Sequence, residues 1–182
     1  IRPETGAVLA PRIVALVRSE VLTPPSSRFF LLGLTSSGAI DTGFGGDGWI
    51  EVTRPNLGLL ASTAKLAIDG NGGLHVLVTR FDPNGIDDLD LFVFSCFPDG
   101  GLPMIPLLVI ADPGDDDPED PVGRDIEIAP NGMWIVSYAL ASTAMIHLHR
   151  PSPVENKTLS LDNTIAHEVV VQGNLRLVSG YD

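Results

Sequence analysis

The chain has 182 residues, of which 44% are hydrophobic and 6% aromatic, so it can bury one core built chiefly from aliphatic side chains. Its formal net charge of −12 argues against a nucleic-acid partner, because an acidic surface repels phosphate groups. No apolar run is long enough for a membrane-spanning helix, and 19 glycines with 15 prolines favour short strands joined by turns.

Short apolar segments that end at turn residues predict an all-β fold. Several are continuous apolar runs such as Ile13–Val17 and Leu91–Phe94, which are typical of strands buried on both faces. Residues 56–65 have helical propensity but no convincing cap, and we expect a loop there. In chain order the expected strands cover residues 6–10, 12–18, 28–34, 49–53, 64–68, 74–80, 90–97, 106–111, 125–129, 133–140, 145–150, 158–161, 167–171 and 175–179.

A strand, a Gly-containing turn and a second strand recur along the chain, and two further strands follow each full copy. The copies begin at Gly6, Lys65 and Asp125, at intervals of about 60 residues, and a shorter copy begins at His167. The pattern predicts four-stranded antiparallel blades at about 5–55, 62–112 and 124–162, followed by a half-blade at 166–182.

The stretch from Ser36 to Val52 carries a turn, an Ile-Asp pair, a Gly-flanked Phe and a second Gly-rich turn that leads into a strand. This order of parts resembles the delta-60 repeat of bacterial β-propellers, and Phe97-Pro98-Asp99-Gly100 is close to a turn of the same family. The resemblance implies a β-propeller-like array in a secreted or extracytoplasmic protein. It also implies turn-shaping or blade-anchoring roles for Gly38, Asp41, Phe44, Gly45, Gly48, Asp99 and Gly100.

About three and a half blades cannot close a ring, so the array is expected to need another chain or further blades. An open stack exposes a hydrophobic blade face at each end. Protein and carbohydrate both remain open as classes of ligand.

His147 and His149 lie at i and i+2 of an expected strand and therefore point to one face, as two metal ligands would. A zinc site needs at least a third ligand, which His167 or Glu168 supplies only if the fold brings them near. The alternative is a pair of covered histidines with ordinary hydrogen-bond partners, and the repeat places them where the earlier blades carry apolar residues.

The acidic run 112–121 offers Asp115, Asp117 and Asp120 as oxygen ligands for Ca²⁺. Its spacing does not match an EF-hand loop and its prolines favour an extended linker, so a solvated acidic loop is the competing interpretation. No cofactor is required by any motif, and calcium remains open.

The remaining chemical signals favour structural roles. Cys96 lies in an apolar run, which predicts a buried and unreactive thiol. His75, Trp134 and Arg176 occupy equivalent repeat positions, where large side chains either line a binding surface or fill gaps between blades.

Three functions are consistent with these patterns. The first is a non-enzymatic scaffold or binding module, which the absence of catalytic residues from the repeat motif favours. The second is a propeller-type hydrolase or lyase with a metal or histidines near a central channel. The third is a subunit or fragment that completes a larger propeller with a partner chain.

Overall fold

The computed structural model of the chain describes residues 12–22, 25–52, 60–81, 89–101, 106–110, 121–140, 143–151, 154–161, 165–172 and 175–181. Every regular element in these ranges is a β-strand, which confirms the predicted all-β class. No helix long and apolar enough to cross a membrane occurs among the described residues. The strands are β1 (Ile13–Leu22), β2 (Pro25–Leu34), β3 (Trp49–Glu51), β4 (Leu60–Ile68), β5 (Leu74–Phe81), β6 (Leu89–Cys96), β7 (Pro106–Ile110), β8 (Pro121–Ile128), β9 (Trp134–Leu140), β10 (Thr143–Pro151), β11 (Val154–Leu161), β12 (Ile165–Gln172) and β13 (Leu175–Tyr181).

The strands form four antiparallel sheets, and in each sheet neighbours in space are neighbours in sequence. We call them the first sheet (β1-β2-β3), the second sheet (β4-β5-β6-β7), the third sheet (β8-β9-β10-β11) and the fourth sheet (β12-β13). Antiparallel neighbours can be joined directly, here by connections that range from the turn at 69–73 to the loop over residues 35–48. The strand expected over residues 6–10 lies outside the described residues.

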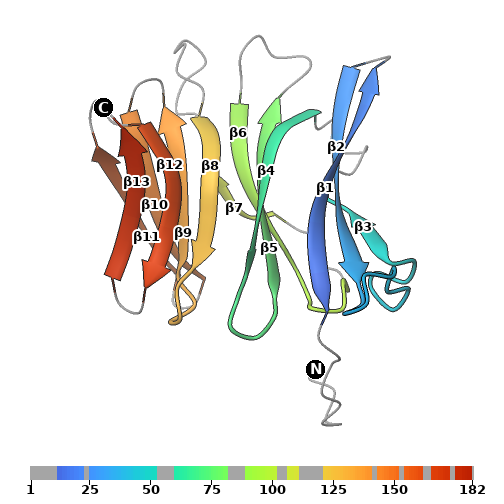
Figure 1. Cartoon of the computed structure of the whole chain (residues 1–182). Coiled ribbons are helices and arrows are strands. Elements are labelled where there is room, and N and C mark those ends of the chain that lie inside the picture. Colours follow the sequence, from blue (N-terminus) through green and yellow to red (C-terminus); the bar gives the residue numbers. More distant parts are fainter. Residues whose placement is uncertain are drawn as a thin grey trace.

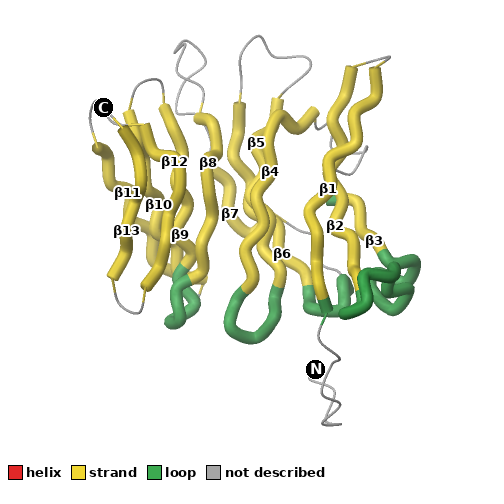
Figure 2. Tube along the Cα trace, in the orientation of Figure 1, coloured by secondary structure: helices red, strands yellow, loops and turns green. Residues whose placement is uncertain are grey.

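The sheets form an open row, with the first sheet at one end and the third and fourth sheets overlapping in the view at the other (Figures 1 and 2). Consecutive sheets pack on each other through their early strands: β1 and β2 contact β4, β4 contacts β8, and β8 contacts β12. The contacts of β4 with β8 and of β8 with β12 therefore join the first strands of consecutive sheets, although these strands are far apart in the sequence.

The strands β5 and β9, inside the second and third sheets, are buried on both faces. Along β5, Leu74, Val76 and Val78 belong to a core shared with the first sheet, whereas Leu77 belongs to a core shared with the third sheet. Successive side chains of a strand point to opposite faces, so a continuous apolar run contributes to a core on each face when both faces are covered.

The run Ile13–Val17 departs from the expectation of burial on both faces. Val14 and Leu16 pack against the core, but Ile13 and Val17 are exposed on the other side of β1. The physical reason is that, among the described elements, no sheet covers that side of the first sheet. We call this side the outer face.

The expected loop over residues 56–65 is also wrong from Leu60 onward. There the chain already belongs to β4, which pairs with β5 from Leu60 opposite Phe81 through a register shift near Thr63. Pairing with a neighbouring strand decides the conformation, and local propensity is overridden.

Four turns in the described chain share one hydrogen-bond pattern. In each, the N–H of the fourth residue donates to the carbonyl of the first at 2.8–2.9 Å, and the N–H of the first donates to the carbonyl of the fifth at 2.8–3.2 Å. The fourth residue is always glycine with φ between 77° and 83°, as a type I turn followed by a left-handed residue requires. The turns are residues 35–39, 69–73, 97–101 and 129–133.

This shared geometry corrects one alignment made from the sequence. Because Gly72 and Gly132 occupy the same turn position, Trp134 corresponds to Leu74, and His75 corresponds to Ile135. His75 and Trp134 therefore lie on opposite faces of their respective sheets and are not equivalent.

Candidate functional site

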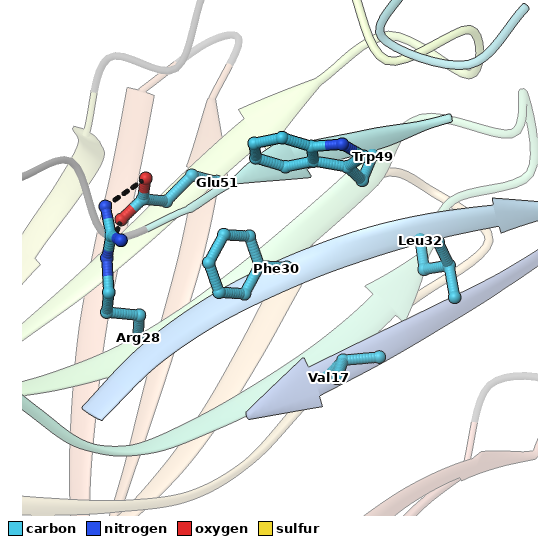
Figure 3. Close-up of a pocket in the computed structure, with 6 residues that line it drawn as sticks. All are labelled: Val17, Arg28, Phe30, Leu32, Trp49 and Glu51. Carbon is cyan, nitrogen blue, oxygen red and sulfur yellow. Dashed lines mark hydrogen bonds and ion pairs between the residues drawn. The ribbon is translucent and has the colours of Figure 1, made fainter. Parts of the chain in front are cut away.

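The outer face of the first sheet carries an open groove of about 440 Å³ lined by side chains from all of its strands (Figure 3). Val17 lies opposite Phe30 in the register of β1 and β2, and Leu32 lies opposite Trp49 in that of β2 and β3. Residues paired in this way share one face of a sheet, which is why the six lining side chains meet. They are Val17, Arg28, Phe30, Leu32, Trp49 and Glu51.

Aromatic rings form the centre of the groove. The rings of Phe30 and Trp49 lie 5.5 Å apart in an edge-to-face arrangement, and Trp49 remains about half exposed. Such a pair presents a large apolar area with little conformational freedom to lose, which suits contact with another apolar surface.

One end of the groove is closed by an ion pair. Arg28 binds Glu51 through two hydrogen bonds of 2.7 Å, and its guanidinium carbon lies 5.7 Å from the centre of the Phe30 ring (Figure 3). The two charges neutralise each other, so the groove attracts neither a cation nor an anion strongly. Its chemistry is that of an apolar contact surface.

A second cluster of rings lies between the second and third sheets. Trp134 of β9 is buried, with the His75 ring of β5 at 5.1 Å and the His149 ring of β10 at 5.0 Å. Since His75 belongs to the second sheet and the other two to the third, these rings are part of the contact between the sheets.

His75 is held in place by two polar neighbours. Its Nδ1 is hydrogen-bonded to Ser95 Oγ at 2.7 Å, and its Nε2 lies 3.2 Å from Asp69 Oδ2. Burial disfavours the charged form of Asp69, but hydrogen bonds from His75 and from the N–H groups of Gly73 and Asn71 outweigh it and lower the pKa of this carboxyl. A buried histidine satisfied in this way has a structural explanation.

The structure places His147 and His149 together on β10, on the face directed at the second sheet. His149 Nδ1 is 2.6 Å from Asn156 Oδ1 and His147 Nδ1 is 3.0 Å from Thr158 Oγ1, both across the pairing with β11. His147 Nε2 is buried without a hydrogen-bond partner. Burial lowers the pKa of His147, a hydrogen bond donated to Asn156 opposes this by favouring the protonated ring, and the nearby His149 lowers it further.

Within the described ranges no group of three or more His, Cys, Asp or Glu side chains is positioned to share a metal ion. His167 and Glu168 lie on β12, in a stretch whose side chains are outside the described set. Asp115, Asp117 and Asp120 lie outside the described residues, so calcium binding there stays a prediction.

The residues expected to shape the repeat lie along the loop that joins β2 to β3 and in the turn after β6. Asp41 accepts hydrogen bonds from Arg12 Nε at 2.6 Å and from the Gly43 N–H at 3.0 Å, and the bond from Arg12 lowers the pKa of its carboxyl most. Phe44 is fully buried beneath the Arg12 guanidinium, whose carbon lies 5.4 Å from the ring centre.

Glycine is required at several points of this loop and turn for steric reasons. Phe44 fills the space that a Cβ at Gly33 would need, and the Ile40 side chain does the same at Gly48. Gly38, Gly45 and Gly100 adopt positive φ angles of 83°, 62° and 79°. Asp99 caps its own turn by accepting a 2.8 Å hydrogen bond from the Gly101 N–H.

Sequence reasoning anticipated an exposed apolar face at each end of an open stack but did not identify its residues. The sequence contained the pattern that places these residues on one face: Arg28, Phe30 and Leu32 are spaced by two residues, and so are Trp49 and Glu51. The ring cluster around Trp134 was missed because the alignment was displaced by one residue at the preceding turn.

Comparison of the chain with protein-family models, curated protein sequences and solved structures found no match.

Proposed function

We propose that the chain is a run of consecutive blades of a β-propeller with delta-60-like repeats, and that it acts as a non-enzymatic scaffold or interaction module. The observation that carries the proposal is the row of meander sheets packed face to face, with β4, β8 and β12 in contact one after another. In a propeller, successive blades pack in this order, and the first strand of each blade lies nearest the central axis. By resemblance, its setting is secreted or extracytoplasmic.

The recurrence of one turn supports the same proposal. Two of the four equivalent turns, at 69–73 and 129–133, join the first and second strands of the second and third sheets. The other two, at 35–39 and 97–101, follow β2 and β6, which precede the last strands of the first and second sheets. Repetition of both the sheet and its turns is the signature of an array in which each unit packs only on its neighbours.

The polar groups of the array serve its packing. His75 is bound by Ser95 and Asp69, and Thr79 Oγ1 accepts a 3.0 Å hydrogen bond from the Gly123 N–H, which joins the second sheet to the third. A scaffold needs such groups to fix the register between blades and does not need a reactive group.

Elemental analysis of the purified chain, together with the double variant His147→Ala/His149→Ala, separates the scaffold from a metal-dependent hydrolase or lyase. The scaffold predicts no stoichiometric metal bound through these histidines, so the double variant should contain the same amount of metal as the wild type and respond to chelator in the same way. One equivalent of metal per chain, retained by His75→Gln but lost in the double variant, would overturn the proposal in favour of the enzyme.

A further inference from the structure

The outer face of the first sheet corresponds, position by position, to faces that are buried elsewhere in the chain. Cross-strand pairing matches Ile13 with Leu34 and Leu74 with Cys96, and both Leu34 and Cys96 precede the same kind of turn. Ile13 is therefore equivalent to Leu74.

The exposures of equivalent residues differ sharply. By the same register Val17 is equivalent to Val78. Ile13 and Val17 are 52% and 40% exposed, whereas Leu74 and Val78 are 2% and 0% exposed because the first sheet covers them. The outer face thus has the residue pattern of a sheet-to-sheet contact without a sheet on it.

The contacts inside the chain also have a direction. The face of the second sheet that carries Leu74 packs against the first sheet, and the face of the third sheet that carries Trp134 packs against the second. In both cases this face meets the opposite, non-equivalent face of the preceding sheet. The outer face of the first sheet should therefore accept the trailing face of another sheet and not a second outer face.

The other end of the row supplies a sheet in the required orientation. The fourth sheet packs on the third through β12, and among the described elements no sheet follows it (Figure 1). A second copy placed head to tail brings its fourth sheet to the outer face of the first sheet and continues the spacing of the row.

We propose that the outer face of the first sheet binds a second copy of this chain, stacked head to tail through that copy's fourth sheet. The inference rests on the proposed propeller-like array. Because such a contact joins two different faces, it closes into a ring or extends as a chain of copies.

The charges of the chain set the conditions for this association. Arg28 and Glu51 neutralise each other on the outer face, so the contact itself is apolar, but two chains of net charge −12 repel each other at long range. Salt screens that repulsion and strengthens apolar burial, so association should increase from about 0.1 M to about 1 M sodium sulfate.

Light scattering coupled to size-exclusion chromatography tests the proposal, with Val17→Glu as the disrupting variant. The wild-type chain is expected to show masses that are multiples of 19.3 kDa and that increase with concentration and salt. A carboxylate at position 17 should weaken association by about 100-fold or more, because it would be buried without a partner.

Val154→Glu is the matched control. Val154 is 70% exposed on β11, away from the outer face, so the same substitution there adds the same charge and should leave the mass distribution like that of the wild type. Circular dichroism of both variants checks that the fold persists, which is expected because both positions are already solvent-accessible.

The orientation is tested with Val17→Cys under mild oxidation. Head-to-tail stacking keeps the two substituted positions apart, so the variant should form no more disulfide-linked dimer than the wild type, which carries Cys96 alone. Efficient linkage between two V17C chains would overturn the head-to-tail contact in favour of two outer faces meeting.

A 19.3 kDa mass for the wild type at every concentration and salt level would overturn the inference. So would a monomer whose tryptophan fluorescence responds to cellohexaose in the wild type but not in a Trp49→Phe variant, since that result assigns the groove to a carbohydrate. Neither result bears on metal content, so failure of this inference is distinguishable from failure of the proposed scaffold function.

Discussion

The backbone N–H of Gly45 donates a 2.8 Å hydrogen bond to the carbonyl oxygen of Asp99, and this bond ties the first sheet to the second. The same turn is held a second time, because Arg12 Nη1 donates to the Pro98 carbonyl at 2.9 Å while its Nε binds Asp41. The loop after β2 therefore has a role beyond closing its own sheet. It fixes how the first sheet sits against the second.

Gly100→Ala should destabilise the chain more than Gly38→Ala. Both glycines have positive φ in equivalent turns, which costs an alanine about 1 kcal/mol. A Cβ at Gly38 meets nothing within 4 Å, but one at Gly100 lies 2.8 Å from the Gly45 nitrogen and 2.7 Å from Ile50 Cδ1. The expected loss in unfolding free energy is about 1 kcal/mol for G38A and about 2–4 kcal/mol for G100A.

Urea denaturation of the two variants measures this difference directly. Equal losses in G38A and G100A would show that the turn after β6 does not press on the loop around Gly45, and that the contact between the sheets lies elsewhere.

Phe44→Ala should cost about 3–5 kcal/mol, because the ring is fully buried in the core between the first and second sheets and packs on Gly33. Phe97→Ala is the matched control, since Phe97 is exposed and its loss should cost less than about 1 kcal/mol. Thermal unfolding by calorimetry compares the two. A similar melting temperature for both variants would contradict the buried position of Phe44.

Asp69→Asn should remove a pH-dependent contribution to stability. The pKa of Asp69 in the folded chain is below its ordinary value of 3.8, so folding favours its charged form. Its contribution is complete above pH 3.8 and is lost as pH falls through the lower folded value.

At pH 7 the variant should be less stable by about 1 kcal/mol, because Asn retains an acceptor for the Asn71 and Gly73 N–H groups but not the charge. The gap between wild type and variant should narrow as pH falls well below 3.8, as followed by urea denaturation across the acid range. Parallel stability curves down to pH 2 would contradict the lowered pKa.

Much of the strand order was predictable because apolar runs bounded by Gly, Pro and Asp mark strands without reference to the rest of the chain. The limits of the strands were less predictable. β8 begins at Pro121, earlier than the expected residue 125, because pairing with β9 extends it. Pairing partners that are distant in sequence decide such limits, and local residue preferences do not contain them.

The candidate site was harder to predict for a related reason. Trp49 is half exposed, whereas Trp134 is enclosed between His75 and His149. This difference depends on which face of each sheet is covered by a neighbouring sheet. If an alignment is displaced by one residue at a turn, every following side chain is assigned to the wrong face of the sheet. The turn at 69–73 contains three glycines, so the sequence alone did not show which of them corresponds to Gly132.

Cys96 should react far more slowly with a thiol reagent in the native chain than after unfolding. Burial in the core between the first and second sheets, with a smaller effect from the charge of Asp99, raises its pKa from 9.0 to about 11. At pH 8 the thiolate fraction then falls from about a tenth to about a thousandth, which slows the reaction about 100-fold before access is considered.

Since Cys96 is the one cysteine of the sequence, the absorbance change on adding Ellman's reagent reports on it alone, and the urea-unfolded chain provides the reference rate. Rapid stoichiometric labelling of the native chain would mean that the first and second sheets separate readily, and the contact between Gly45 and Asp99 would then not hold them together in solution.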